Sequence, residues 1–338
     1  MFDSILAFID RHQTFIITTH DSPDADGIGA ELVLALILKN KGKEVRIINS
    51  SPVPKVLKFI ETNTVIEKWD PSMLKQEEQL VKFKNAAFLV MDACEEIHLG
   101  PVRELLKIVK EAFIIDHHEP KPGSKLSGFV DSSSSSASEI AIEFADFMNV
   151  ALDLQTAIAA YTGIVFDTGS FSYPKTTVRT FKAAIKTLEY GVEPNYIYKQ
   201  LMENLSTSAI LLQKQALANL EFLINNSVAL MILRLEDFEA AGADYEEVDN
   251  IVNIPIKARD VEVSFLIKEK TKGEYFCSLR SKGAINVSKI AQYFGGGGHV
   301  TASGFRSTES IEKIVEKLLS YLEPLHKKDN LSEMENWR

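Results

Sequence analysis

Apolar and polar positions follow a regular order along the first half of the chain. Short apolar runs lie near residues 15–19, 44–49, 86–91 and 112–115, and the stretches between them carry apolar residues at helical spacing, as in residues 27–40. Short apolar runs bounded by turn residues are typical of buried strands. Strands that alternate with helices indicate a mainly parallel sheet covered on both faces, so we predict an α/β fold.

The second half has a different pattern. Residues 154 to about 225 are almost entirely helical in spacing, and strand-like runs return at 228–235, 261–268 and 275–280, followed by short helices at 287–294 and 310–322. This order predicts a smaller α/β domain. We expect a catalytic domain over residues 1–190, a helical linker over 191–225, a second domain over 226–325 and a disordered polar tail over 326–338, with the active site in the cleft between the two domains.

A run of five serines, residues 132–136, follows a predicted strand at 129–131. Ser136 and Glu139 have the spacing of a capping box ahead of an apolar helix. We therefore interpret the run as the start of that helix rather than as a flexible linker.

Side chains with metal-binding chemistry follow three predicted strands and one predicted helix. They are His20, Asp21, Asp24 and Asp26 after the first strand, Asp92 after the third, Asp116, His117 and His118 after the fourth, and Asp167 after the helix. Ligands of open α/β sheets bind at the carboxyl ends of the strands. Carboxylates gathered there without a cation would raise one another's pKa. The pattern therefore predicts a pair of divalent metal ions.

The ligand types narrow the choice of metal. Mixed carboxylates and imidazoles without a nearby thiolate suit Mn²⁺ better than a closed structural zinc site, and Mg²⁺ and Co²⁺ are the next choices. Two such ions roughly 3.5–4 Å apart can clamp the attacking and leaving oxygens of an in-line phosphoryl displacement. Phosphoryl transfer to water is the reaction that this pattern indicates.

Composition limits the cellular setting and the partners. The chain has 338 residues, of which 45% are hydrophobic, and this length suffices for two cores. Cys94 and Cys277 argue for a reducing compartment rather than a disulfide framework. We find no signal peptide and no uninterrupted apolar run of about 18 residues, so we expect a cytoplasmic protein that does not enter membranes. The net charge of −10 disfavours binding of long duplex nucleic acid but permits a local nucleotide pocket.

Five motifs in this sequence are similar to those of a known family. HDSPDADG, the MDA that contains Asp92, DHHEP, the FDTGSF that contains Asp167, and GGGGHVTASGF follow one another in family order over nearly the whole chain. They resemble the DHH phosphoesterases with their associated C-terminal substrate-binding domain, within the RecJ-like superfamily. The compact layout is most similar to the nanoRNase and pAp phosphatase branch. One departure is His98, where many relatives carry an arginine.

The resemblance implies a role for each candidate position. One metal ion would be held by His20, Asp24 and Asp92, and the second by Asp26, Asp92, His117 and Asp167, with Asp92 as the bridge. His118 would face the scissile phosphate as an electrophile or general acid. Asp116 would orient an imidazole, whereas Asp21 has no clear role beyond capping a turn.

The second domain contains candidates for substrate binding. Glycines at 295–298 would let backbone N–H groups approach a phosphate, and Arg280 could pair with one bidentately. A glycine turn beside a surface arginine is the ordinary alternative. The resemblance favours substrate binding by Arg280, Gly297, Gly298, His299 and Ser303.

The family resemblance implies a two-metal phosphodiesterase that hydrolyses very short oligonucleotides, such as dinucleotides and nanoRNA, to mononucleotides, and that also dephosphorylates pAp. Relatives that act on cyclic di-AMP or other cyclic dinucleotides share the same layout, so this alternative stays open. An inorganic pyrophosphatase or exopolyphosphatase is a second alternative, against which the GGGGH turn argues. A non-catalytic nucleotide-binding regulator is the third. Family relatives are often dimers, and we carry a homodimer as an expectation.

Overall fold

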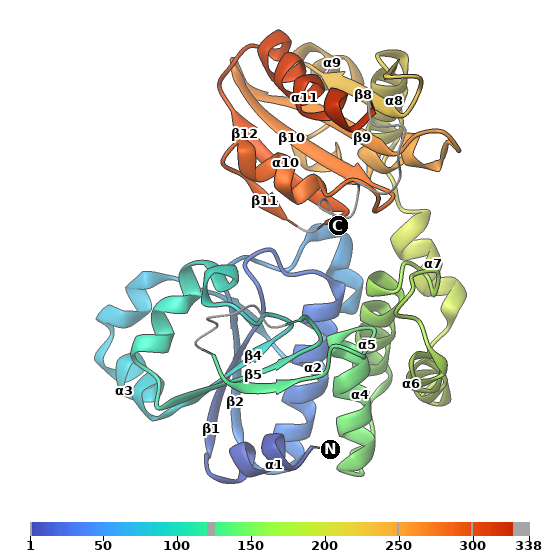
Figure 1. The fold of residues 1–338 in the computed structure, drawn as a ribbon. Helices are drawn as coiled ribbons and strands as arrows, with labels where there is room; N and C mark the ends of the chain where they lie inside the picture. The colour runs from blue at the N-terminus through green and yellow to red at the C-terminus, as the bar shows by residue number, and fades with distance from the viewer. Residues whose placement is uncertain (1, 120–125, 249, 299, 327–338) are drawn as a thin grey trace. The chain divides into compact units, whose positions relative to one another are not determined.

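The computed structural model describes residues 2–119, 126–248, 250–298 and 300–326. It divides the chain into two compact units, residues 1–204 and residues 205–338. Figure 1 shows the elements of each unit. Each unit has its own sheet and its own hydrophobic cores, so each is described by itself.

A six-stranded parallel sheet forms the centre of the first unit, in the order β3-β2-β1-β4-β5-β6. The strands are β1 (Thr14–Thr18), β2 (Glu44–Asn49), β3 (Ile66–Lys68), β4 (Ala87–Met91), β5 (Glu111–Asp116) and β6 (Gly128–Val130). The helices are α1 (Asp3–Asp10), α2 (Ala25–Asn40), α3 (Glu77–Asn85), α4 (Ala137–Phe147), α5 (Leu154–Asp167), α6 (Val178–Glu189) and α7 (Pro194–Met202), with 3₁₀ helices at η1 (Lys55–Ile60), η2 (Pro71–Lys75) and η3 (Glu96–Lys107).

Each face of this sheet packs against its own set of helices. Side chains alternate along a strand, so Phe15 and Ile17 of β1 enter the core that contains α1, α2, α4 and α5. Ile16 points to the opposite face, where it packs with Phe83 of α3 and Leu99 of η3. The prediction of a mainly parallel sheet with both faces covered is therefore confirmed.

Two glycines let α2, α4 and α5 pack closely. A Cβ atom on Gly29 of α2 would lie 2.6 Å from the carbonyl oxygen of Ala159 in α5. A Cβ atom on Gly163 of α5 would lie 3.0 Å from the carbonyl oxygen of Ala25 and closer still to the hydroxyl of Ser138 in α4. These three helices carry or support several of the predicted site residues, so their spacing affects the site.

The serine run begins a helix, as predicted, but only half of the capping box forms. Ser136 is the N-cap of α4, and its hydroxyl accepts a hydrogen bond from the Glu139 N–H at 3.0 Å. The Glu139 side chain does not return to Ser136. It accepts from the Ser135 hydroxyl and lies 3.2 Å from Arg179 of α6, which is a stronger partner for a buried carboxylate.

The second unit contains a mixed sheet in the order β11-β12-β10-β9-β8-β7, in which only the β8–β9 pair is parallel among the described residues. The strands are β7 (Glu221–Leu223), β8 (Val228–Leu233), β9 (Val263–Thr271), β10 (Glu274–Ser281), β11 (Gly297–Gly298) and β12 (Ala302–Ser307). The helices are α8 (Thr207–Ala218), α9 (Leu235–Ala241), α10 (Val287–Tyr293) and α11 (Ile311–His326), with 3₁₀ helices at η4 (Tyr245–Val248), η5 (Ile251–Asn253) and η6 (Pro255–Lys257).

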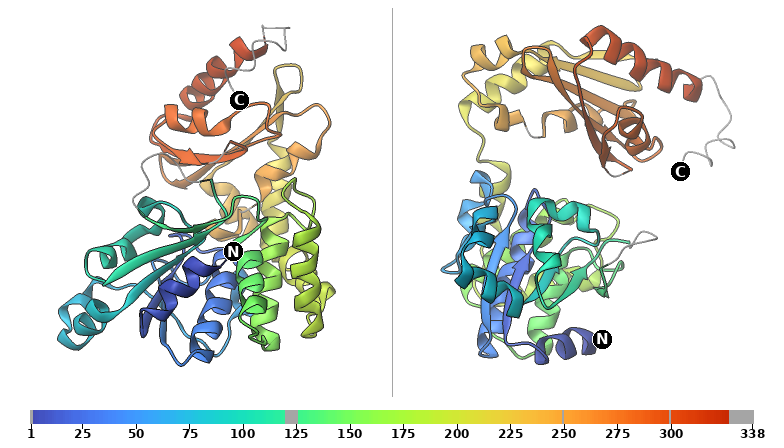
Figure 2. Two further views of the ribbon diagram at one scale, coloured as in Figure 1. Left: turned by 60° about the horizontal axis from the view of Figure 1, so that its bottom comes forward. Right: turned by 90° about the vertical axis from the view of Figure 1, so that its left-hand side faces the viewer.

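Helices cover both faces of the second sheet. One core joins α10 and α11 to the strands, and another joins α8 and α9 to side chains on the opposite face, such as Met231 and Leu266. Figure 2 shows this sheet and its helices from two further directions. The predicted second α/β domain is confirmed as a mixed α/β unit.

Several predicted boundaries need correction. Residues 191–225 are not a separate linker, because Ile197 of α7 packs into the first unit while Leu212 of α8 packs into the second. β7 lies at the end of the stretch that was expected to be helical, and the predicted strand at 228–235 ends at Leu233, where α9 follows. The predicted disordered tail after residue 326 lies outside the described residues.

Candidate metal centre and active site

The topology brings three of the predicted motifs to one edge of the first sheet. β1 lies between β2 and β4, so the order of the strands reverses at the β1–β4 pair. His20 follows the end of β1, and Asp92 follows directly after β4. Asp116 is the last residue of the next strand, β5. Ligands of doubly wound sheets bind at this reversal point, so the fold places these residues where a site is expected.

His20, Asp24 and Asp92 form one cluster. The Nε2 atom of His20 lies 3.5 Å from Oδ2 of Asp24 and 3.7 Å from Oδ2 of Asp92. One ligand atom from each residue lies within 4.8 Å of the others. This is the set that the family resemblance assigns to one metal ion.

Asp26, His117 and Asp167 form a second cluster that adjoins Asp92. The Nε2 atom of His117 lies 3.2 Å from Oδ2 of Asp167, 3.3 Å from Oδ1 of Asp92 and 3.9 Å from Oδ2 of Asp26. Asp92 therefore faces one cluster with Oδ2 and the other with Oδ1. A bridging carboxylate needs this arrangement.

Helix N-termini hold two of the aspartates in place. Asp24 is the N-cap of α2, and its Oδ1 accepts hydrogen bonds from the N–H groups of Asp26 and Gly27. The Asp26 carboxylate accepts hydrogen bonds from the N–H groups of Ala137 and Ser138 at 2.7 and 2.8 Å. These N–H groups begin α4, so the helix dipole stabilises a charged Asp26. The serine-rich helix start thus serves the site by fixing a candidate ligand.

Burial and mutual repulsion oppose ionisation of the clustered carboxylates. Burial, together with the charges of Asp26 and Asp24, raises the pKa of Asp92 well above its ordinary value. Burial and the charge of Asp26 raise the pKa of Asp167 to about 8. Burial likewise raises the pKa of Asp26, although His117 acts in the opposite direction. A pair of cations would remove this cost.

The donor atoms fit such cations. Among the described residues, Oδ1 of Asp92 and Nε2 of His117 are buried and have no hydrogen-bond partner. Asp92 also has a φ of 56°, in the left-handed region that few non-glycine residues adopt. Backbone strain and buried polar atoms without a hydrogen-bond partner are typical of functional positions. Carboxylate oxygens and imidazole nitrogens are suitable ligands for Mn²⁺ and for Mg²⁺ or Co²⁺.

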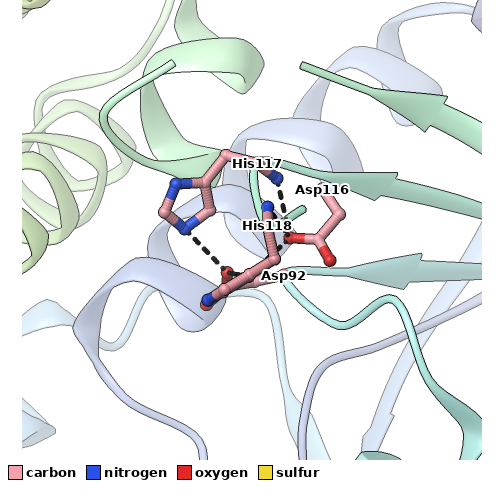
Figure 3. Close-up of side chains that lie close together, drawn as sticks. All are labelled: Asp92, Asp116, His117 and His118. Carbon is pink, nitrogen blue, oxygen red and sulfur yellow. Dashed lines mark hydrogen bonds and ion pairs between the residues drawn. The ribbon is translucent and has the colours of Figure 1, made fainter. Parts of the chain in front are cut away.

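Asp116 organises the two histidines that follow it, as Figure 3 shows. Its Oδ1 accepts hydrogen bonds from the N–H groups of His117 at 2.7 Å and His118 at 3.1 Å, and it lies 2.8 Å from Nδ1 of His118. Burial opposes ionisation of Asp116, but the hydrogen bond from His118 and the other contacts lower its pKa. Asp116 is thus a charged anchor that orients the His118 ring, whose side chain is 40% exposed.

Two buried residues that the sequence analysis did not select support this edge of the sheet. Asn49, at the end of β2, accepts a hydrogen bond from the Thr19 N–H at 3.2 Å and donates one to Glu31 of α2 at 2.9 Å. Thr19 directly precedes His20. The rule about strand ends would have selected Asn49, which closes a predicted strand. The sequence signal for Glu31 is weaker, because it is only an acidic residue within an otherwise apolar helix.

Asp21 and His98 lie beside the cluster without joining it. The Asp21 N–H donates to the carbonyl oxygen of His98 at 2.6 Å, and the Asp21 side chain is exposed. Gly100 packs against that side chain and has a φ of 64°, so a larger residue there would be strained. A turn-capping role of the Asp21 side chain stays a prediction.

The substrate-binding candidates of the second unit meet at β10, β11 and β12. Arg280 pairs with Ala302, and Gly298 pairs with Ser303. A Cβ atom on Gly298 would lie 2.6 Å from the Ala302 carbonyl oxygen, so close strand packing explains this glycine, whereas the space beside Gly297 is open. The Ser303 hydroxyl donates to the carbonyl oxygen of Val287 at 2.6 Å. His299 lies outside the described residues, and substrate binding by this group stays a prediction.

Comparisons with known proteins agree with this architecture. The DHH family, N-terminal domain, matches residues 14–164, and the DHHA1 domain matches residues 225–324. A probable bifunctional oligoribonuclease and PAP phosphatase NrnA from Streptococcus mutans is 31% identical over 308 residues, which cover 90% of this chain and 93% of that protein. The NrnA of Thermus thermophilus is 29% identical over 85% of this chain and 82% of that protein.

Two further comparisons extend the picture. The cyclic-di-AMP phosphodiesterase GdpP of Bacillus subtilis is 24% identical over 93% of this chain, but the match covers 49% of that protein. The crystal structure of an exopolyphosphatase-related protein from Bacteroides fragilis superimposes with a TM-score of 0.86 at 24% identity, covering 96% of this chain and 97% of that one. The last comparison shows that the two chains share a fold.

A parallel sheet with aspartate and histidine clusters at its reversal point, followed by a second α/β unit, defines a hydrolase of the phosphoesterase class. The family matches make this assignment specific: the chain belongs to the DHH family of phosphoesterases and carries the associated DHHA1 domain. The family prediction is confirmed.

Proposed function

We propose that this protein is a two-metal phosphodiesterase that hydrolyses very short oligonucleotides to mononucleotides and also removes the 3′-phosphate of pAp. The observation that carries the proposal is Asp92, whose two carboxylate oxygens face two separate clusters of metal-binding side chains. The relatives named as bifunctional oligoribonuclease and PAP phosphatase support the choice of substrates.

The proposed ligands follow the two clusters. His20 and Asp24 would hold one Mn²⁺ ion, Asp26, His117 and Asp167 would hold the other, and Asp92 would bridge them. Bound divalent ions would supply a water of lowered pKa and neutralise phosphate charge. Mn²⁺ is our first choice because the donors mix carboxylates with imidazoles, and Mg²⁺ and Co²⁺ follow.

His118 would act on the scissile phosphate. Its Nδ1 is engaged by Asp116, so proton donation to the leaving oxygen would proceed through Nε2. Asp116 would keep the ring oriented. Arg280, Gly297, Gly298, His299 and Ser303 are proposed to bind the remainder of the substrate.

The cellular location and the binding partners of the enzyme are also proposals. No described helix has the length and apolar character that crossing a bilayer requires. Cys94 and Cys277 are buried and are not joined in a disulfide, as suits a reducing compartment. We propose a cytoplasmic enzyme that acts on short oligonucleotides and nucleotides and binds neither membranes nor long duplexes.

We also propose that the protein forms a homodimer, as the family resemblance implies. Light scattering after size exclusion should report a dimer, and a monomeric wild-type protein would exclude it.

A product time course tests the substrate assignment. The Mn²⁺-loaded protein would be offered pApA, a five-nucleotide RNA, pAp, cyclic di-AMP and pyrophosphate in parallel. Rapid formation of AMP from pApA and the short RNA supports the proposal, and turnover of pAp supports the second activity. Cleavage confined to cyclic di-AMP would favour the activity named for GdpP, and phosphate release from pyrophosphate alone would favour a pyrophosphatase. Tight nucleotide binding without turnover would indicate a regulator.

A further inference from the structure

Lys175 places a positive charge beside the aspartate and histidine clusters. It lies in the exposed turn between α5 and α6, eight residues after Asp167. Its Nζ atom donates a hydrogen bond to the carbonyl oxygen of His117 at 3.2 Å. Its charge also acts on the Asp167 carboxylate, where it favours the ionised form. The ammonium group is therefore fixed at the margin of the second cluster.

The surroundings leave this ammonium suited to bind an anion. A lysine carries three N–H donors, and the His117 carbonyl occupies one of them. The residue is exposed, so its other donors can reach solvent or a ligand. In the part of the chain that the structure describes, no other lysine or arginine forms a hydrogen bond or ion pair with the residues of the two clusters.

The bound carbonyl also fixes where the charge can act. His117 provides both the proposed metal ligand Nε2 and the main-chain oxygen that holds Lys175. The Lys175 charge also acts on the Asp167 carboxylate of the same cluster, so it would attract an anion that binds there. A lysine is a compact point charge without a fixed fork of donors, so it recognises phosphate charge rather than the shape of a base.

We propose that Lys175 binds a non-bridging oxygen of the scissile phosphate and so contributes to substrate binding in this site. The inference rests on the proposed function and adds a substrate contact that none of the five sequence motifs contains. A charge-assisted hydrogen bond of about 1.4 kcal/mol corresponds to about tenfold in affinity. Because the contact exists in the bound ground state, its loss raises KM more than it lowers kcat.

The variants Lys175→Gln and Lys175→Arg test this proposal, with Lys182→Gln on α6 as a control that removes another exposed lysine. We expect Lys175→Gln to raise KM about tenfold for both pApA and pAp. Lys175→Arg should restore most of the loss, because it keeps the charge, and Lys182→Gln should match the wild type. Calorimetric titration with AMP should show the same weakening of binding for Lys175→Gln alone.

A purely structural role would give a different result. We expect Lys175→Gln to leave the melting temperature and the Mn²⁺ stoichiometry unchanged. If Lys175 only tethered the turn to the His117 carbonyl, the variant would lower both quantities. A decrease in both would overturn the proposal. Unchanged KM and AMP affinity would overturn it as well. Failure of the wild-type protein to cleave any of the offered substrates would count against the proposed function, and AMP titration would still decide the role of Lys175.

Discussion

At the scale of single residues, the site depends on side chains that are costly in the absence of a partner. Asp92 combines burial, raised pKa and a left-handed backbone. Glu31 is also fully buried, and its one hydrogen bond within the described residues comes from Asn49. Such residues reduce stability unless a ligand or a proton compensates them, so their substitution should change stability and function in different directions.

Asp92→Asn should separate these two effects. Because burial and the neighbouring carboxylates raise the pKa of Asp92, the metal-free fold must keep a proton on this carboxyl group, which costs stability at neutral pH. Asparagine needs no such proton, so the metal-free variant should melt at a higher temperature than the metal-free wild type. Substituting a residue that only contacts a metal ligand lowers metal affinity roughly 10–100-fold, and Asp92→Asn should lower Mn²⁺ affinity by more than this. The variant should also lose activity. Differential scanning fluorimetry with and without Mn²⁺ measures both effects. Asp70→Asn, at an exposed carboxylate, is the control. Wild-type metal affinity in Asp92→Asn would contradict the bridging role.

Glu31→Gln tests the buried acid. Burial raises the pKa of Glu31 from 4.5 to about 8, despite the hydrogen bond from Asn49. The folded state then holds a proton that the unfolded state releases, so the wild type loses stability as the pH rises from about 4.5 to about 8. Glutamine has no such proton. Denaturant unfolding should give similar stabilities near pH 4.5 and a more stable variant near pH 8.5, and a constant difference between these pH values would refute the shift.

At the scale of elements, helix packing and helix ends set the positions of the ligands. The N-terminus of α4 holds Asp26 through two N–H groups, and α5 ends at Asp167. Gly163 of α5 lies against Ser138 at that same N-terminus. A shift of α5 relative to α4 would therefore move two candidate ligands at once.

Gly163→Ala should show this coupling. Its methyl group would meet the Ser138 hydroxyl and crowd the main chain of Ala25 and Asp26. We expect a loss of about 1–3 kcal/mol in unfolding free energy, as is typical of overpacking, and weaker Mn²⁺ binding. Ser138→Ala removes the nearest clashing atom, so the double variant should recover part of the stability. If the loss of unfolding free energy in the double variant equals the sum of the losses in the two single variants, the clash is not with Ser138.

At the scale of the whole molecule, two units with separate cores carry different parts of the proposed function. The candidate metal ligands all belong to the first unit, and the DHHA1 match lies in the second. A ligand that binds one folded unit stabilises that unit by mass action. Metal binding should therefore affect the two units unequally.

Calorimetry should resolve two unfolding transitions, and Mn²⁺ should raise the melting temperature of only one of them.

Because the pKa values of Asp26, Asp92 and Asp167 are raised, the metal-free cluster holds protons that a bound cation must displace. Mn²⁺ affinity should consequently rise as the pH rises through about 8, the pKa of Asp167. Titrations in buffers of different ionisation enthalpy measure the released protons. No proton release at pH 6 would show that the carboxylates are already ionised.

The strand ends explain how much of the fold and of the candidate site could be predicted from the sequence. Periodicity located the main strands of the first sheet, and the motifs after them contain His20, Asp92 and Asp116, because strand ends are local features of the chain. Short, partly exposed β3 and the boundary near residue 205 were missed, because short strands carry little periodic signal and unit boundaries depend on which core a helix joins. The support from Asn49 and Glu31 needed contacts between separate elements.

The sequence by itself determined the family, the α/β class and the identity of the candidate ligands, since these follow from local periodicity and from motif order. Only the tertiary structure decided that Asp92 faces both clusters, that α4 fixes Asp26, and that Lys175 reaches the carbonyl of His117. These features join residues that are distant in the chain. Their distances follow from strand order and helix packing, which no local pattern of residues encodes.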